Sequence, residues 1–104
     1  MFELDPKLAS AEIIISWIPD ADFFPAGVTF TTATVTIRTS PYSKVRDDNP
    51  NAMLSGGPQV AGDGLSVKQL VIGGVPGAKY ILEYLANFSD GIQRDGEQAT
   101  IEVQ

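Results

Sequence analysis

The sequence predicts an all-β protein folded as an antiparallel β-sandwich. Apolar and β-branched residues recur in short runs with a period of two, which is the spacing of a half-buried strand. Ten glycines and seven prolines in 104 residues stand mainly between these runs and indicate turns. No convincing helix is visible, because the best candidate, residues 4–11, is short and begins at Asp5-Pro6.

Five runs are predicted to be the main strands of a single domain that covers residues 1–104. The clearest is Thr31–Thr39, where β-branched residues stand at almost every position. With short edge strands added, the total of about seven suits a small sandwich. The five main runs are 12–18, 31–39, 65–72, 79–88 and 98–103, and the edge candidates are 2–4, 52–54 and 59–60.

Turn residues separate these runs and leave one long polar segment. Glycine turn signals stand at 63–64, 73–74, 90–91 and 95–96. The segment 40–63 is rich in Gly, Pro, Asp and Asn, and we expect a long loop there.

The last two main runs are predicted to pair as a hairpin through a symmetric loop at 89–96. Apolar side chains then meet in three couples: Leu82 with Val103, Tyr84 with Ile101, and Ala86 with Ala99. The same register places Glu83 opposite Glu102 on the outer face, where like charges repel. Arg38, on the neighbouring 31–39 run, is predicted to face outward and relieve this repulsion.

Two runs break the alternation of apolar and polar residues. Ile14 and Ile18 stand on the opposite parity from Ile15 and Trp17, and the 65–72 run changes parity as a bulge at Lys68-Gln69 would cause. We expect burial on both sides, under the termini or long loops. The alternative is an apolar contact surface for a neighbouring subunit.

Composition excludes several classes of function. The chain has no cysteine and no histidine, so disulfides, histidine-based triads, Cys–His nucleophiles and His/Cys zinc sites are impossible. Thirteen acidic residues against seven basic ones give a net charge of −6, which argues against nucleic acid or an anionic membrane as the partner. The first residues show no signal-peptide pattern, and we expect a location in a cytoplasm or in a particle assembled there.

Three motifs together resemble a known group of proteins. They are Ile15-Ser16-Trp17 on an early strand, the Thr-rich strand, and Gly73–Tyr80, in which a Pro-Gly turn leads to a tyrosine at the start of a strand. Trp17 and this turn resemble fibronectin type III and related immunoglobulin-like sandwiches. In such domains the tyrosine hydroxyl ties the turn to the strand. The segment 40–60 is longer than the corresponding loop of fibronectin-like domains.

The full order of motifs resembles small structural proteins encoded among the head and tail genes of tailed bacteriophages. The residues that carry this resemblance are Asp5-Pro6, Trp17, Thr29 to Thr36, Gly73-Gly74, Gly77, Tyr80 and Gly91. It implies an immunoglobulin/fibronectin III-like fold and a structural or assembly role in a virion, with no catalytic residues to assign.

The remaining candidates for chemistry are weak. The acidic residues Asp20, Asp22, Asp47 and Asp48 could offer oxygen ligands, but the 20–22 pair lacks the other ligands of a calcium loop and 47–50 is typical of a solvated turn. Glu83 and Glu102 would form an acid pair on an open face, with no cleft to raise the pKa of one member. We therefore expect no enzyme activity, no cofactor and no metal.

Four residues are the candidate partner contacts. In Phe23-Phe24-Pro25 the two adjacent rings cannot point the same way, so one is expected to plug the end of the sandwich and the other to be exposed as an anchor. Tyr42 and Arg46 give the long segment local aromatic and basic character.

The resemblance implies a non-enzymatic phage virion protein of the head, neck or tail that acts by protein–protein contacts. Its partners would be other virion proteins, with a homo-oligomer or symmetric lattice left open, and it would lie in the virion and, during assembly, in the host cytoplasm. Strand addition at a sheet edge and insertion of Phe23 or Phe24 are the two expected modes of contact. The alternative is a carbohydrate-binding or adhesive β-sandwich module.

Overall fold

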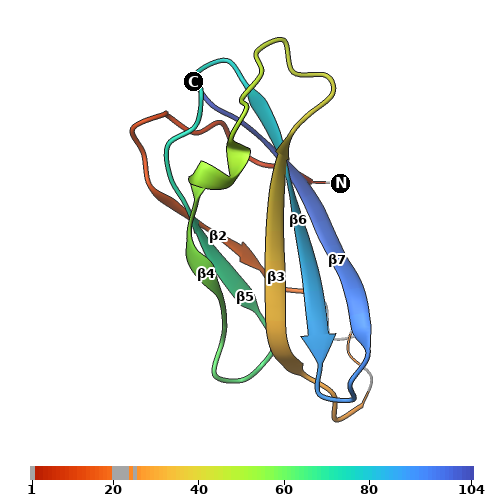
Figure 1. The fold of residues 1–104 in the computed structure, drawn as a ribbon. Coiled ribbons are helices and arrows are strands. Elements are labelled where there is room, and N and C mark those ends of the chain that lie inside the picture. The colour runs from red at the N-terminus through yellow and green to blue at the C-terminus, as the bar shows by residue number, and fades with distance from the viewer. Residues whose placement is uncertain (1, 20–23, 25) are drawn as a thin grey trace.

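Seven strands in two packed sheets make up the computed structural model, which describes residues 2–19, 24 and 26–104 (Figure 1). One sheet has the order β1-β7-β6-β3 and the other β2-β5-β4. All neighbouring strands are antiparallel except β1 and β7, which are parallel. The strands are β1 (Phe2–Glu3), β2 (Ile13–Trp17), β3 (Phe30–Thr39), β4 (Leu54–Val60), β5 (Val67–Val71), β6 (Lys79–Phe88) and β7 (Gln93–Glu102).

This arrangement confirms the predicted all-β sandwich of the immunoglobulin/fibronectin III-like class. The sheet β2-β5-β4 faces β7-β6-β3, which are the two layers of a constant-type immunoglobulin sandwich without its first strand. The chain adds β1 along β7 instead. The long axis of the molecule measures 43 Å, and the strands run roughly along it (Figure 1).

The core lies between the sheets and is centred on β6. The even-numbered side chains of β6, from Tyr80 to Phe88, are all buried, as its alternation predicted. Across the core the Trp17 ring lies 5.1 Å from the Phe30 ring and 5.6 Å from the Tyr84 ring, centroid to centroid. Tilted aromatic pairs at such distances stabilise by about 0.5–1.5 kcal/mol beyond the burial of their area.

The predicted register of the β6–β7 hairpin is wrong. Leu82 lies opposite Ala99, four residues earlier along β7 than Val103, and Glu83 lies opposite Gln98 instead of Glu102. The reason is the turn, which spans 89–92 and closes with a hydrogen bond from the Phe88 N–H to the Ile92 carbonyl at 3.1 Å. An even-numbered slip keeps the same faces inward, so apolar packing alone did not distinguish the two registers.

The predicted turn at Asp95-Gly96 is also wrong, because Gly96 lies inside β7 at a bulge opposite Tyr84. A Cβ atom on Gly96 would come within 2.6 Å of both the Trp17 ring and the Tyr84 carbonyl oxygen. The bulge and the missing side chain together make room for the indole.

The irregularity expected at Lys68-Gln69 lies on the partner strand instead. Strand β5 alternates regularly with Gln69 buried, while the register of β4 shifts between Ser55 and Gln59. The Gln69 side-chain amide donates hydrogen bonds to the carbonyls of Ser55 and Gly56, at 3.5 and 3.2 Å. A buried glutamine therefore satisfies backbone carbonyls that the bulged ladder leaves open.

The long loop predicted at 40–63 is wrong in its second half. Residues 40–49 are a loop, but a 3-10 turn, η2 (Pro50–Met53), and then β4 follow. Burial on both sides of β2 is also wrong, because Ile14 and Ile18 are exposed. Their side chains belong to the outer surface of the three-stranded sheet and its end.

Candidate functional site

The acidic residues of the described part of the chain are spread over its surface and loops. Among them no three Asp, Glu, His or Cys side chains gather as a metal site would need. Asp20 and Asp22 lie outside the described residues. Within the described part of the chain no helix is long and apolar enough to cross a membrane.

Tyr80 forms the predicted corner between the turn and β6. Its side chain is completely buried, and its hydroxyl accepts a hydrogen bond from the Val75 N–H at 2.9 Å. The same hydroxyl donates to Asp47 Oδ2 at 2.8 Å. Burial raises the pKa of Tyr80, and the Asp47 carboxylate adds to this effect.

Asp47 is therefore part of the corner, not a residue of a solvated turn as its sequence context indicated. Its carbonyl accepts a hydrogen bond from the Thr39 hydroxyl at 3.1 Å, and its other carboxylate oxygen accepts the Asn49 N–H at 2.9 Å. These contacts hold the 40–49 loop against β3 and β6. The sequence gives no signal for the Asp47–Tyr80 pair, because 33 residues separate them.

Lys7 is a second buried polar residue that sequence reasoning missed. Only 2% of its surface is exposed, and its Nζ donates hydrogen bonds to the carbonyls of Gly73 at 2.7 Å and Leu8 at 2.8 Å. Burial lowers the pKa of Lys7, while the nearby Glu12 carboxylate opposes this shift. The ammonium group thus fixes the N-terminal segment to the loop between β5 and β6.

Tyr84 ties the two sheets together through its hydroxyl, which donates to the Ile15 carbonyl at 2.8 Å. Burial raises the pKa of Tyr84 to about 12. Trp17, Tyr80 and Tyr84 are all buried, so none of them forms an open stacking platform for a sugar ring or base.

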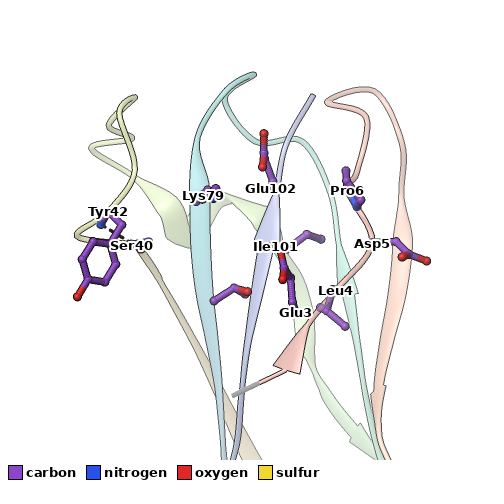
Figure 2. A pocket seen from close by; sticks show the side chains of 10 residues that line it. Glu3, Leu4, Asp5, Pro6, Ser40, Tyr42, Lys79, Ile101 and Glu102 are labelled. Atoms are coloured by element: carbon purple, nitrogen blue, oxygen red, sulfur yellow. Dashed lines mark hydrogen bonds between the residues drawn. The ribbon is translucent and has the colours of Figure 1, made fainter.

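Tyr42 is the exposed aromatic residue of the 40–49 loop, with 88% of its surface accessible. It borders a groove of about 490 Å³ that runs over the ends of β6 and β7 to the N-terminal segment. Figure 2 shows Tyr42 at one margin of this groove and Asp5 at the other. Glu3, Glu102 and Lys79 also line it.

The Tyr42 loop is held by two serines. The Ser40 N–H donates to the Lys79 carbonyl at 2.9 Å, and the Tyr42 N–H donates to Ser40 Oγ at 3.2 Å. Ser43 Oγ accepts the Lys79 N–H at 3.0 Å. Arg46 lies on the same loop and is exposed, but it does not line the groove, so the structure does not bring the two predicted contacts into one site.

Phe24 takes the plugging role that the sequence predicted for one of the two adjacent rings. It is half-buried, and its ring lies 5.0 Å from the Phe30 ring and 5.7 Å from the Phe88 ring. Phe23 lies outside the described residues. Phe24 and Tyr42 belong to opposite ends of the sandwich, so the candidate contacts do not form one surface.

We name these ends by their loops. The corner end comprises the loops 40–49 and 72–78, and the hairpin end comprises residues 18–19, 24, 26–29, 61–66 and 89–92 (Figure 1). The corner end holds the Tyr80 and Lys7 hydrogen bonds and the Tyr42 groove, and the hairpin end holds the Phe24–Phe30–Phe88 cluster.

Comparison with protein-family models and with curated proteins found no match to this chain.

Proposed function

We propose that this chain is a non-enzymatic structural or assembly component of a tailed-phage particle, in its head, neck or tail. It acts by protein–protein contacts with other virion proteins, in the virion and, during assembly, in the host cytoplasm. The main support is the resemblance in motif order, since Trp17, Gly77 and Tyr80 occupy the places that those proteins give them.

The roles of the buried residues are consistent with this proposal. Tyr80, Tyr84 and Lys7 use their polar groups for internal hydrogen bonds that join strands and loops. Large apolar side chains such as Ile14 and Ile18 are exposed instead. A rigid sandwich with outward apolar groups suits a building block better than a reaction centre.

Particle composition tests the proposal. Particles of the phage or prophage that carries the coding sequence are purified, and mass spectrometry measures the copy number of this chain relative to the major capsid protein. We expect a fixed copy number that fits the symmetry of the head, neck or tail. Particles that lack the chain, and that assemble normally after deletion of its gene, would refute the proposal.

One observation favours a second candidate, a carbohydrate-binding or adhesive module. The exposed Tyr42 ring stands beside a groove with carboxylates from Glu3, Asp5 and Glu102, and sugar sites combine an aromatic face with hydrogen-bonding groups. A glycan array distinguishes the two functions. Binding that Tyr42→Ala abolishes would favour the carbohydrate module, and an array without signal would leave the structural role.

A further inference from the structure

Strand β2 has one edge along which no described strand lies. It stands first in the sheet order β2-β5-β4 and pairs with β5 on its other side. In a constant-type immunoglobulin sandwich the first strand of the fold covers this edge. Here the N-terminal segment runs along β7 instead, with Phe2 opposite Ala99 and Lys7 opposite Val103. The edge of β2 is therefore open to pairing with a strand from another molecule.

Two other edge strands, β3 and β4, carry features that hinder such pairing. Strand β4 contains Pro58 and a bulge, since its register shifts between Ser55 and Gln59. Strand β3 carries the exposed Arg38. By contrast, residues 14–18 at the edge of β2 read Ile-Ile-Ser-Trp-Ile, without a charge or a proline. An uncharged apolar edge is the kind that pairs with another strand.

Apolar side chains surround this free edge. Ile14 and Ile18 are 65% and 72% exposed, and Ser16 is exposed between them. A hollow of about 360 Å³ lies between β2 and the N-terminal segment, and it is lined by Leu4 and Ile15 among others. A strand added to β2 would cover both the isoleucines and the mouth of this hollow. Burial of exposed apolar surface favours association.

The sequence of the segment 14–18 is symmetric about Ser16 in its apolar and polar residues. In an antiparallel pair with the same segment of a second copy, Ser16 can lie opposite Ser16. Ile14 of each copy then lies opposite Ile18 of the other on the outer face, and Ile15 lies opposite Trp17 on the core face. Each couple is apolar except the central serines, which are small and can hydrogen-bond to each other. A self-paired edge needs this symmetry, whereas an edge that binds a different protein does not.

No like charges are brought into contact within this register. Lys68 lies opposite Ser16 on β5, so the Lys68 residues of the two copies would be three strand spacings apart, about 14 Å. This distance exceeds the Debye length of about 8 Å at physiological ionic strength. Glu3 and Glu12 lie near the segment, and each copy has a net charge of −6. These charges oppose approach at low ionic strength, so added salt should strengthen the association.

We propose that the free edge of β2 is a homodimer interface, in which residues 14–18 of two copies pair antiparallel about Ser16. The two three-stranded sheets then form one sheet with the order β4-β5-β2-β2-β5-β4. The symmetry of the segment selects a second copy of this chain as the partner. This inference goes beyond the proposed function and does not depend on the virion.

Analytical ultracentrifugation of the full chain, from micromolar to about millimolar concentration, tests the dimer. We expect a reversible monomer–dimer equilibrium that added salt shifts toward the dimer. Ile14→Lys is expected to raise the dissociation constant about tenfold or more, because it disrupts the Ile14–Ile18 couple at both ends of the interface. Leu8→Lys makes the same charge change at an exposed leucine outside β2 and should leave the dissociation constant unchanged.

Urea denaturation verifies that both variants fold. A chain that stays monomeric at every concentration and ionic strength would overturn the proposal. Equal weakening by Ile14→Lys and Leu8→Lys would also overturn it.

A double variant tests the register. In Ile14→Lys/Ile18→Glu the lysine introduced into one copy faces the glutamate introduced into the other, so dimerisation should recover relative to Ile14→Lys alone. Ile14→Lys/Leu8→Glu has the same net charge and should not recover. If neither double variant recovered, or if both did, the register about Ser16 would be wrong.

Cross-linking tests the two-fold position directly, because the chain has no cysteine. Ser16→Cys is expected to form a disulfide-linked dimer on mild oxidation, since residues directly opposite in an antiparallel pair are close enough to be bridged. Ser10→Cys places a thiol outside β2 and should form little covalent dimer. Equal cross-linking of both variants would indicate random collision and overturn the interface.

The results separate this inference from the proposed function. A chain that is monomeric in solution, and whose β2 amides become protected only in assembled particles, would assign the edge to a different virion protein and overturn the homodimer. Absence of the chain from phage particles would refute the virion role and leave the dimer measurements unaffected.

Discussion

The two ends of the sandwich use polar side chains in opposite ways. At the corner end Tyr80, Asp47 and Lys7 point their polar groups inward and join separate loops and strands to one another. At the hairpin end Asp63 and Asp90 accept hydrogen bonds from the Leu65 and Ile92 N–H groups of their own turns, and the Leu65 and Ile92 side chains are exposed.

This difference shows that the two ends of one small fold are stabilised by different interactions. The corner end closes itself by buried hydrogen bonds, where a missing partner would leave a desolvated polar group. The hairpin end is closed by the aromatic cluster of Phe24, Phe30 and Phe88, whose rings pack on one another.

Phe88→Ala is expected to have the largest effect, because it removes the centre of the aromatic cluster at the hairpin end. Phe88 is buried, with its ring 5.1 Å from the Phe30 ring. Truncation of a buried phenylalanine lowers the free energy of unfolding by about 3–5 kcal/mol. Urea denaturation measures the change, with Ile92→Ala as the control. Ile92 belongs to the same end but is exposed, so its truncation should stay within about 0.5 kcal/mol.

A loss below about 1 kcal/mol for Phe88→Ala would show that the cluster does not hold the hairpin end. The contrast between the two ends would then be lost.

Tyr80→Phe tests the corner end and is expected to have an intermediate effect. It removes one hydroxyl and leaves the Val75 N–H and the Asp47 carboxylate without this partner. The free energy of unfolding should fall by about 1–3 kcal/mol, as for other buried groups that lose their hydrogen bond. Amide exchange at Val75 should accelerate, while the turns 61–65 and 88–92 keep their protection apart from the global loss.

Tyr42→Phe is the matched control, because Tyr42 is also on the corner end but its side chain is exposed. It should change stability by less than about 0.5 kcal/mol. If both variants behaved alike, the buried hydroxyl would not be what stabilises the corner.

Local signals in the sequence predicted the strands and the corner tyrosine. They did not predict contacts between residues that are far apart in the chain. Period-two alternation places β6 without error at 79–88. The bulge of β4 depends on Gln69 across the ladder, and the place of Asp47 depends on Tyr80 in another strand. Neither follows from residues near it in the chain, because the partner is chosen by the packed fold.

The candidate contacts show the same limit. An exposed Tyr42 follows from its polar loop, but which ring of Phe23-Phe24 turns inward depends on the position of Phe30 and Phe88. The repeated Asp-Gly-aliphatic pattern was visible in the sequence as two turn signals. The hydrogen bonds that the aspartate of each turn accepts from the following aliphatic residue are seen only in the structure.

Arg38→Gln tests a third kind of polar contact, which lies on the outer face of the sheet and is neither buried nor part of a turn. Arg38 faces outward as predicted, and its Nη1 lies 3.3 Å from Glu83 Oε1, although Glu83 has Gln98 and not Glu102 opposite it. Both side chains are partly exposed to solvent, so removing the charge should lower the free energy of unfolding by only about 0.2–1 kcal/mol at low salt. The loss should vanish near 1 M salt, where the Debye length is about 3 Å.

Arg46→Gln removes the same charge from an exposed loop residue and controls for net charge. An Arg38→Gln loss that equals that of Tyr80→Phe, or that persists at high salt, would mean that burial is not what makes the corner hydrogen bonds strong.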